Sequence, residues 1–128
     1  MKNKIKPTSV AQAVNIIMDT MNPKDIKMIQ SIPRKDMLKF HHTNGRDIRN
    51  EFGLWENNIK LIKDCNDIQK KDYPDEHKEC QDLYATYQEK MPYPIHPDDA
   101  SGVILNELWK TLNYRNKKEK NGKKFKHR

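Results

Sequence analysis

Two histidines, two arginines and an asparagine fall within residues 41–50, next to an apolar stripe that ends in a tryptophan. The residues of this first block are His41, His42, Arg46, Arg49, Asn50 and Trp55. A planar guanidinium binds phosphate or carboxylate through two parallel hydrogen bonds, and a nearby imidazole can donate a hydrogen bond or transfer a proton. The combination predicts an anion pocket. A second interpretation stays open, in which His41 is a core histidine bonded to a backbone carbonyl and the arginines extend into solvent.

A helix over about residues 35–52 would position the first block. Its apolar face would contain Met37, His41, Gly45, Ile48, Phe52 and Trp55. On a helical wheel, His41 lies in the middle of this face, and Arg49, His42 and Arg46 follow along one edge. Glycine costs about 1 kcal/mol relative to alanine inside a helix, so Gly45 predicts that another backbone or a ligand comes close there.

A second block, His96, Asp98 and Asp99, precedes the last predicted helix. Asp98 is expected to cap that helix, and both carboxylates favour the positive end of its dipole. A pair of acid–base carboxylates is the alternative. His96 would join Arg49 if the two helices pack together. The two blocks together are the predicted ligand- or partner-binding residues.

No metal site and no cofactor are predicted. Adjacent His41 and His42 point about 100° apart on a helix, and His77 and Cys80 lack a second ligand pair. We find no glycine-rich dinucleotide loop, no P-loop, and none of the common hydrolase or zinc-finger motifs in the sequence. The missing motifs argue against most familiar enzyme classes, and no catalytic residue is assigned.

The spacing of apolar residues predicts an all-α fold, a small bundle of about four to six helices with a disordered basic C-terminal tail. Thr8 or Ser9 would cap a first helix, and Asn22-Pro23 would end it and start a short second one. Gly53 would end the third helix, and residues 58–64 would form a short fourth. The last helix would bury Ile104, Leu105, Leu108, Trp109 and Leu112.

Residues 1–114 are expected to form the helical domain, with a charged insertion over 66–94 and a basic tail over 115–128. Within the insertion, residues 75–90 predict an outer helix whose Leu83, Tyr84 and Tyr87 face inward. The three prolines of residues 91–97 predict an extended segment before the last helix. The tail has eight Lys and Arg residues against one Glu, so it accounts for the whole net charge of +7. Weak nucleic-acid contacts are expected from Lys117, Lys118, Lys120, Lys123, Lys124 and Lys126.

The chain is expected to be cytoplasmic. No run of about 7 to 15 apolar residues follows its basic start, as a secretory signal would require. No segment approaches the about 20 apolar residues that span a bilayer. Cys65 and Cys80 are expected to be reduced thiols.

The two blocks resemble a family of short, uncharacterised bacterial domains. The shared pattern is His41, Gly45, Ile48-Arg49-Asn50 and Phe52-Gly53-Leu54-Trp55, then His96-Pro97-Asp98-Asp99-Ala100-Ser101 and Leu108-Trp109. The resemblance covers roughly residues 9–65 and 95–112. It implies no known activity for this chain, and the charged segment and the basic tail lie outside it.

Our first functional hypothesis is a noncatalytic binding protein, such as a phage or mobile-element accessory factor that inhibits or engages a host macromolecule. Contact would be made around Arg46, Arg49, Asn50 and Trp55, and a host protein is the expected partner. The Lys-, Asn- and Ile-rich composition is typical of AT-rich genomes. The sequence leaves the oligomeric state open and predicts no membrane partner.

Two other hypotheses stay open. In one, the chain is a small nucleotide-binding or nucleotide-cleaving protein, in which Arg46 and Arg49 hold phosphate and His41 or His96 acts as acid or base. In the other, the basic tail binds nucleic acid, with an affinity that falls steeply as salt rises.

Overall fold

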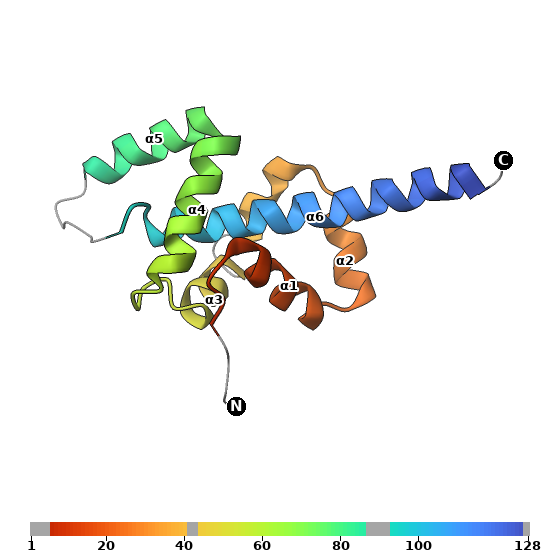
Figure 1. The fold of residues 1–128 in the computed structure, drawn as a ribbon, viewed down its shortest axis with the longest axis horizontal. Helices are drawn as coiled ribbons and strands as arrows, with labels where there is room; N and C mark the ends of the chain where they lie inside the picture. The colour runs from red at the N-terminus through yellow and green to blue at the C-terminus, as the bar shows by residue number, and fades with distance from the viewer. Residues whose placement is uncertain (1–5, 41–43, 87–92, 127–128) are drawn as a thin grey trace.

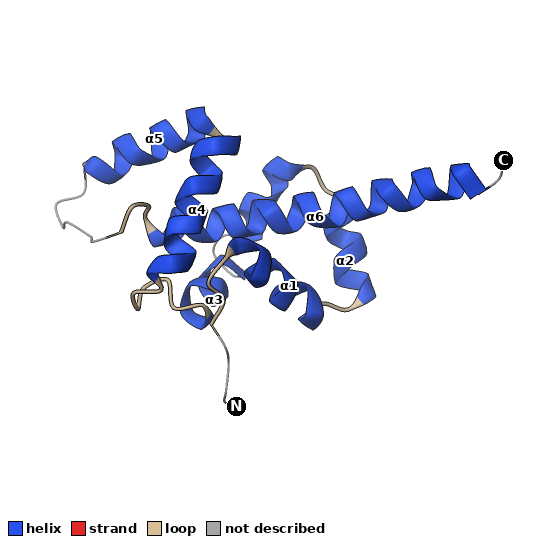
Figure 2. Ribbon diagram, viewed as in Figure 1, coloured by secondary structure: helices blue, strands red, loops and turns tan. Residues whose placement is uncertain are grey.

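The computed structural model describes residues 6–40, 44–86 and 93–126, with the side chains of Leu38 and of residues beyond Tyr114 left out. Within these residues the chain forms six α-helices and a 3₁₀ helix, and no strand (Figure 2). The predicted all-α class is confirmed. The elements are α1 (Val10–Thr20), α2 (Pro23–Gln30), η1 (Arg34–Phe40), α3 (Asn44–Glu51), α4 (Ile59–Asp72), α5 (Pro74–Ala85) and α6 (Pro97–Lys126).

Helix α6 is the central element of the fold. It packs against α1, α2, η1, α3 and α4, whereas α5 packs on α4 (Figure 1). The predicted apolar stripe of α6 is confirmed for Ile104, Leu105, Leu108 and Leu112, which are almost fully buried, whereas Trp109 is only partly buried. Each such side chain stabilises the fold by about 1.5 to 3 kcal/mol relative to exposure. The core is therefore organised around the first half of α6.

The N-terminal helices begin where their capping residues predict. Ser9 caps α1, with its hydroxyl oxygen accepting a hydrogen bond from the Gln12 amide at 3.2 Å. Asn22 caps α2 in the same way through the Asp25 amide at 2.9 Å, and Pro23 occupies the first turn. These two caps satisfy amide groups that a helix start would leave without partners.

The single helix predicted over residues 35–52 is wrong. The chain forms the 3₁₀ helix η1 and then the α-helix α3, and residues 41–43 between them lie outside the described part. The Asp36 amide donates to the Pro33 carbonyl at 2.9 Å, which starts a tight turn rather than an α-helical one. Met37 of η1 and Ile48 of α3 are still buried and Phe40 is partly buried, because a 3₁₀ turn also places residues three apart on one side.

Gly53 ends α3 as predicted. Its φ of +71° lies in the left-handed region, and the Leu54 amide donates back to the Arg49 carbonyl at 3.0 Å. This arrangement is typical of a helix that stops at glycine. Trp55 follows the turn and is 43% exposed, so the predicted extension of the buried face to Trp55 is wrong.

The charged segment is more helical than predicted. The short helix expected at 58–64 continues as α4 to Asp72, because Cys65 and Gln69 extend its buried side by successive turns. On α5, Tyr84 is partly buried, but Leu83 is 60% exposed and does not face inward. Tyr87, the third residue predicted to face inward, lies outside the described residues.

Helix α6 continues beyond the body of the molecule to Lys126 (Figure 1). Its backbone over 115–126 is helical in the structure, and the predicted disorder of the basic tail in solution stays a prediction. Of the helices in the described ranges, none combines the length and the apolar character needed to cross a bilayer.

Gly53 supplies a test of the turn that orients Trp55. Gly53→Ala should lower the free energy of unfolding by about 1 to 2 kcal/mol, since an L-residue is strained in the left-handed region. Urea denaturation at constant pH measures this change. Gly102 is the matched control, because nothing lies within 4 Å of an added Cβ there. Gly102→Ala, inside α6, should stabilise the protein by about 0.5 to 1 kcal/mol, and an equal loss at both positions would contradict the assignment.

Candidate functional site

The two sequence blocks meet where α3 crosses the first turns of α6. Arg49 Nε lies 3.3 Å from Asp98 Oδ1, and Arg49 Nη1 donates to Ser101 Oγ at 3.0 Å. The Ser101 hydroxyl donates in turn to the Asp98 carbonyl at 2.8 Å. One guanidinium thus joins a helix near residue 50 to a helix near residue 100.

Gly45 allows this approach. A Cβ at Gly45 would lie 3.2 Å from Arg49 Nη1, 3.5 Å from Ser101 Oγ and 3.7 Å from the Phe40 carbonyl. The distance to Arg49 Nη1 is shorter than an ordinary van der Waals contact, so a side chain at position 45 would push against the guanidinium. The predicted approach of another backbone or a ligand is not what makes this position tight: the nearest group is the Arg49 guanidinium of the same helix, and the Phe40 carbonyl is only in ordinary contact.

His96, rather than Asp98, caps α6. The Asp98 amide donates to His96 Nδ1 at 3.0 Å, and the Ala100 amide donates to the His96 carbonyl at 2.9 Å. The prediction that Asp98 caps the helix is wrong, because the Asp98 carboxylate faces Arg49 from the first turn. A ring nitrogen that accepts an amide hydrogen bond must be unprotonated, so Nδ1 serves as an acceptor in this geometry.

Two aromatic rings enclose His96, which is only 7% exposed. Trp55 and Tyr84 each lie edge-on to the imidazole, with ring centroids 5.4 Å and 5.6 Å away. The Tyr84 hydroxyl donates to the Tyr93 carbonyl at 3.2 Å. His96 is thereby packed between the turn after α3 and helix α5, which favours a role in positioning the start of α6.

Apart from Asp99, the predicted residues divide into three groups. Arg49, His96, Asp98 and Trp55 come together at the crossing of α3 and α6. Arg46 and Asn50 are exposed on α3. His41, His42 and the side chains of the tail lysines Lys117, Lys118, Lys120, Lys123, Lys124 and Lys126 lie outside the described part of the structure.

Asp99 belongs to a separate contact with α5. The pKa of the Cys80 thiol is raised to about 11 by burial, and further by the charge of Asp99 and a hydrogen bond to it. Gln69 Nε2 donates to Cys80 Sγ at 3.7 Å, and its Oε1 lies 2.9 Å from His77 Nδ1. Among the described residues, no three His, Cys, Asp or Glu side chains gather as a metal site would require.

An apolar groove lies on the other side of α3 from this crossing. It has a volume of about 230 Å³, and its walls come from α1, α2, η1 and α3, with Leu105 and Leu108 of α6 at the floor. The wall residues are Ile17, Thr20, Met21, Asp25, Met28, Ile29, Met37, Phe40, Asn44, Asp47, Ile48, Glu51 and Phe52.

Sequence reasoning missed this groove and the role of Ser101. The available signal for Ser101 was its place at the end of the His96–Ser101 pattern in the family resemblance. For the groove, the apolar positions of the first two helices were recognised, but they were expected to be filled by the core. Which side chains a neighbouring helix leaves partly uncovered depends on tertiary packing that no local pattern records.

The molecule is thus a small all-α protein with an internally paired arginine at a helix crossing and an apolar groove beside it. The model of a family described as a domain of unknown function, DUF6794, matches residues 6–76, and the chain belongs to this family. The match includes the first block and ends within α5, before the second block. No curated protein and no solved structure matches the chain.

Arg49 and Arg46 provide a matched pair for testing the crossing. Arg49→Ala should destabilise the protein by about 1 to 2 kcal/mol, because the Ser101 hydroxyl loses a hydrogen-bond donor and the half-exposed Asp98 carboxylate loses its cation. Arg46→Ala removes the same side chain from an exposed position and should change stability by less than about 0.5 kcal/mol. Urea unfolding measures both. Similar effects at the two positions would show that the crossing does not depend on Arg49.

Thiol chemistry tests the contact between α5 and α6. Asp99→Asn should lower the pKa of Cys80, because the replacement removes a nearby negative charge, and each pKa unit gives about tenfold more thiolate below the titration midpoint. Alkylation of Cys80 at pH 8 should therefore become several times faster. The adjacent Glu79→Gln is the charge control. Buried Cys65, whose pKa is strongly raised mainly by burial, reacts only on unfolding and serves as an internal check. An unchanged Cys80 rate would contradict the contact.

Proposed function

We propose that this protein is a noncatalytic binding protein that holds another macromolecule against the apolar groove. The observation that supports this proposal best is the groove itself, at which the apolar side chains of Ile17, Met21, Met28 and Phe40 stay partly or largely exposed beside the buried core. Met28 on its rim is 44% exposed, although it is a large apolar residue. Such surfaces on soluble proteins commonly mark interaction sites.

The pairing of Arg49 weakens the nucleotide hypothesis. An arginine that grips phosphate needs free donors, but the Arg49 side chain is 12% exposed and already bound to Asp98 and Ser101. A phosphate would have to displace the Asp98 carboxylate and leave its charge without this partner. Arg46 remains an exposed cation on α3 and is a candidate contact at the edge of a bound macromolecule.

The proposed partner is a host macromolecule, and the proposed setting is an accessory factor of a phage or mobile element. The composition of the chain supports the setting. The size of the groove supports a macromolecular partner, since its volume of about 230 Å³ is below the ~300 to 1,000 Å³ typical of small-molecule sites. A groove of this size suits one or two apolar side chains presented by a larger surface.

Affinity capture with two matched variants tests this function. Met28→Lys places a charge on the groove rim and should abolish capture of the partner from a lysate of the source cells. Ile59→Lys makes the same change on α4, outside the groove, where Ile59 is 43% exposed, and should retain capture. The captured protein is then purified and its binding measured by calorimetry. Equal binding to both variants, or turnover of a nucleotide by the wild-type protein without any stable complex, would reject the proposal.

A further inference from the structure

We infer that the groove receives an amphipathic α-helix whose apolar stripe is flanked by lysine or arginine. This inference rests on the proposed function and adds the chemistry of the partner. It follows from three observations: the charge of the rim, the methionines in the walls, and the helical secondary structure of the elements around the groove.

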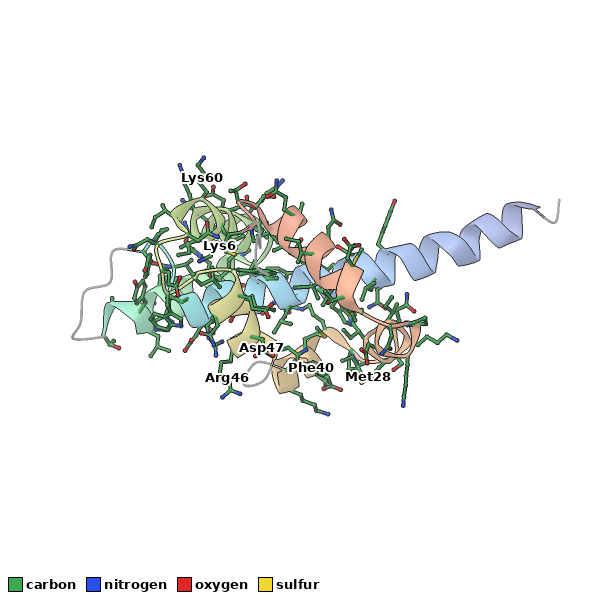
Figure 3. The ribbon with its side chains drawn as sticks, turned by 90° about the horizontal axis from the view of Figure 1, so that it is seen from below. Lys6, Met28, Phe40, Arg46, Asp47 and Lys60 are labelled. Atoms are coloured by element: carbon green, nitrogen blue, oxygen red, sulfur yellow. The ribbon has the colours of Figure 1, made fainter. Side chains whose placement is uncertain are left out.

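The rim of the groove is acidic. Asp25 at the start of α2 and Asp47 on α3 are exposed and line the groove from two different elements. Glu51 lines it one turn beyond Asp47, and the described lining includes no Lys, Arg or His. Seen from below, Asp47, Phe40 and Met28 follow one another along this side of the molecule (Figure 3). Complementary cations at the edges of a bound segment would therefore be attracted and held in register.

Methionine is concentrated in the walls. The chain has six methionines, and three of them, Met21, Met28 and Met37, line the groove. Unbranched, polarisable thioether side chains adapt to ligands of different shape, and they are common on surfaces that bind amphipathic helices. These three residues come from the end of α1, from α2 and from η1, so they border the hollow from separate elements.

The bounding elements favour a helical occupant. All walls are helical, and the described residues contain no strand to which an extended peptide could add. A helix would place two apolar side chains, at i and i+3 or i+4, over Leu105 and Leu108 at the floor. Its polar flanks would then lie next to Asp25 and Asp47.

The basic end of the chain itself is a poor fit for this role. Residues 115–128 supply the cations, but Phe125 is their only large apolar residue, so they cannot present an apolar stripe. The occupant we infer is therefore a segment of another protein, and binding of the chain's own end is a competing outcome.

Selection from a random peptide library tests the inference. A displayed library of peptides of about 16 residues, roughly four helical turns, is selected on the full-length wild-type protein and depleted on Met28→Lys. We expect the enriched peptides to carry apolar residues at helical spacing and a net positive charge. Enriched peptides that are acidic or lack this spacing, or no enrichment at all, would overturn the inference.

Rim variants then test the charge contribution with one enriched peptide. Replacing Asp25 and Asp47 together by asparagine should weaken binding about fivefold at low salt, and by less at high salt, as expected for exposed charges. Asp67→Asn on α4 is the charge control and should have no effect. A peptide of residues 112–128 is measured in parallel. Equal loss in the control, no loss in the rim variant, or tighter binding of the chain's own peptide would overturn the inference.

The two proposals fail in distinguishable ways. If the captured partner depends on Met28 but binds through an acidic or extended segment, the binding function stands and the helical, basic partner is excluded. If no captured protein distinguishes Met28→Lys from Ile59→Lys, the proposed function itself fails.

Discussion

The ion pair and hydrogen bond of Arg49 with the first turns of α6 fix the position of α3. Because α3 has only eight residues, it is too short to be a stable helix alone and depends on such tertiary contacts. Asp98 and Ser101 lie one turn apart on α6, so a single guanidinium that reaches both sets the angle and the register of the crossing. The glycine at position 45 provides the space for this guanidinium.

The same contact determines which functions the site can support. An arginine bound to its own chain positions a helix and is not available to a ligand, whereas an exposed arginine one turn earlier is available. Asp98 remains about half exposed, so solvent screens part of its attraction to Arg49, and the geometric role of the pair exceeds its energetic one. The chemistry suggested by the residue types thus serves to place α3, and the open apolar surface lies on the other side of that helix.

Local signals predicted much of the fold, and long-range packing accounts for the rest. Ser9, Asn22 and Gly53 act through neighbours a few residues away, so the helix ends that they form could be predicted. The apolar stripe of α6 follows the helical period and could be predicted in the same way. The exposure of Leu83 and the capping by His96 depend on how distant segments pack against them. For the site, the sequence predicted that the two blocks could meet. The partners of Arg49 and the groove could not be predicted, because they depend on the relative positions of five elements.

The groove stays open because its walls are attached to α6 at separate points. Arg49 holds α3 at Ser101, whereas Gln30 Nε2 donates to the Leu112 carbonyl at 3.0 Å and Trp109 Nε1 donates to the Ile32 carbonyl at 2.7 Å. The eight residues from 101 to 109 span about 12 Å of helix, and the floor residues Leu105 and Leu108 lie between these attachments. Directional hydrogen bonds at both ends keep α2 and α3 from closing over the floor, which apolar packing alone would favour. The proposed partner would add its apolar side chains over Leu105 and Leu108, between these attachments.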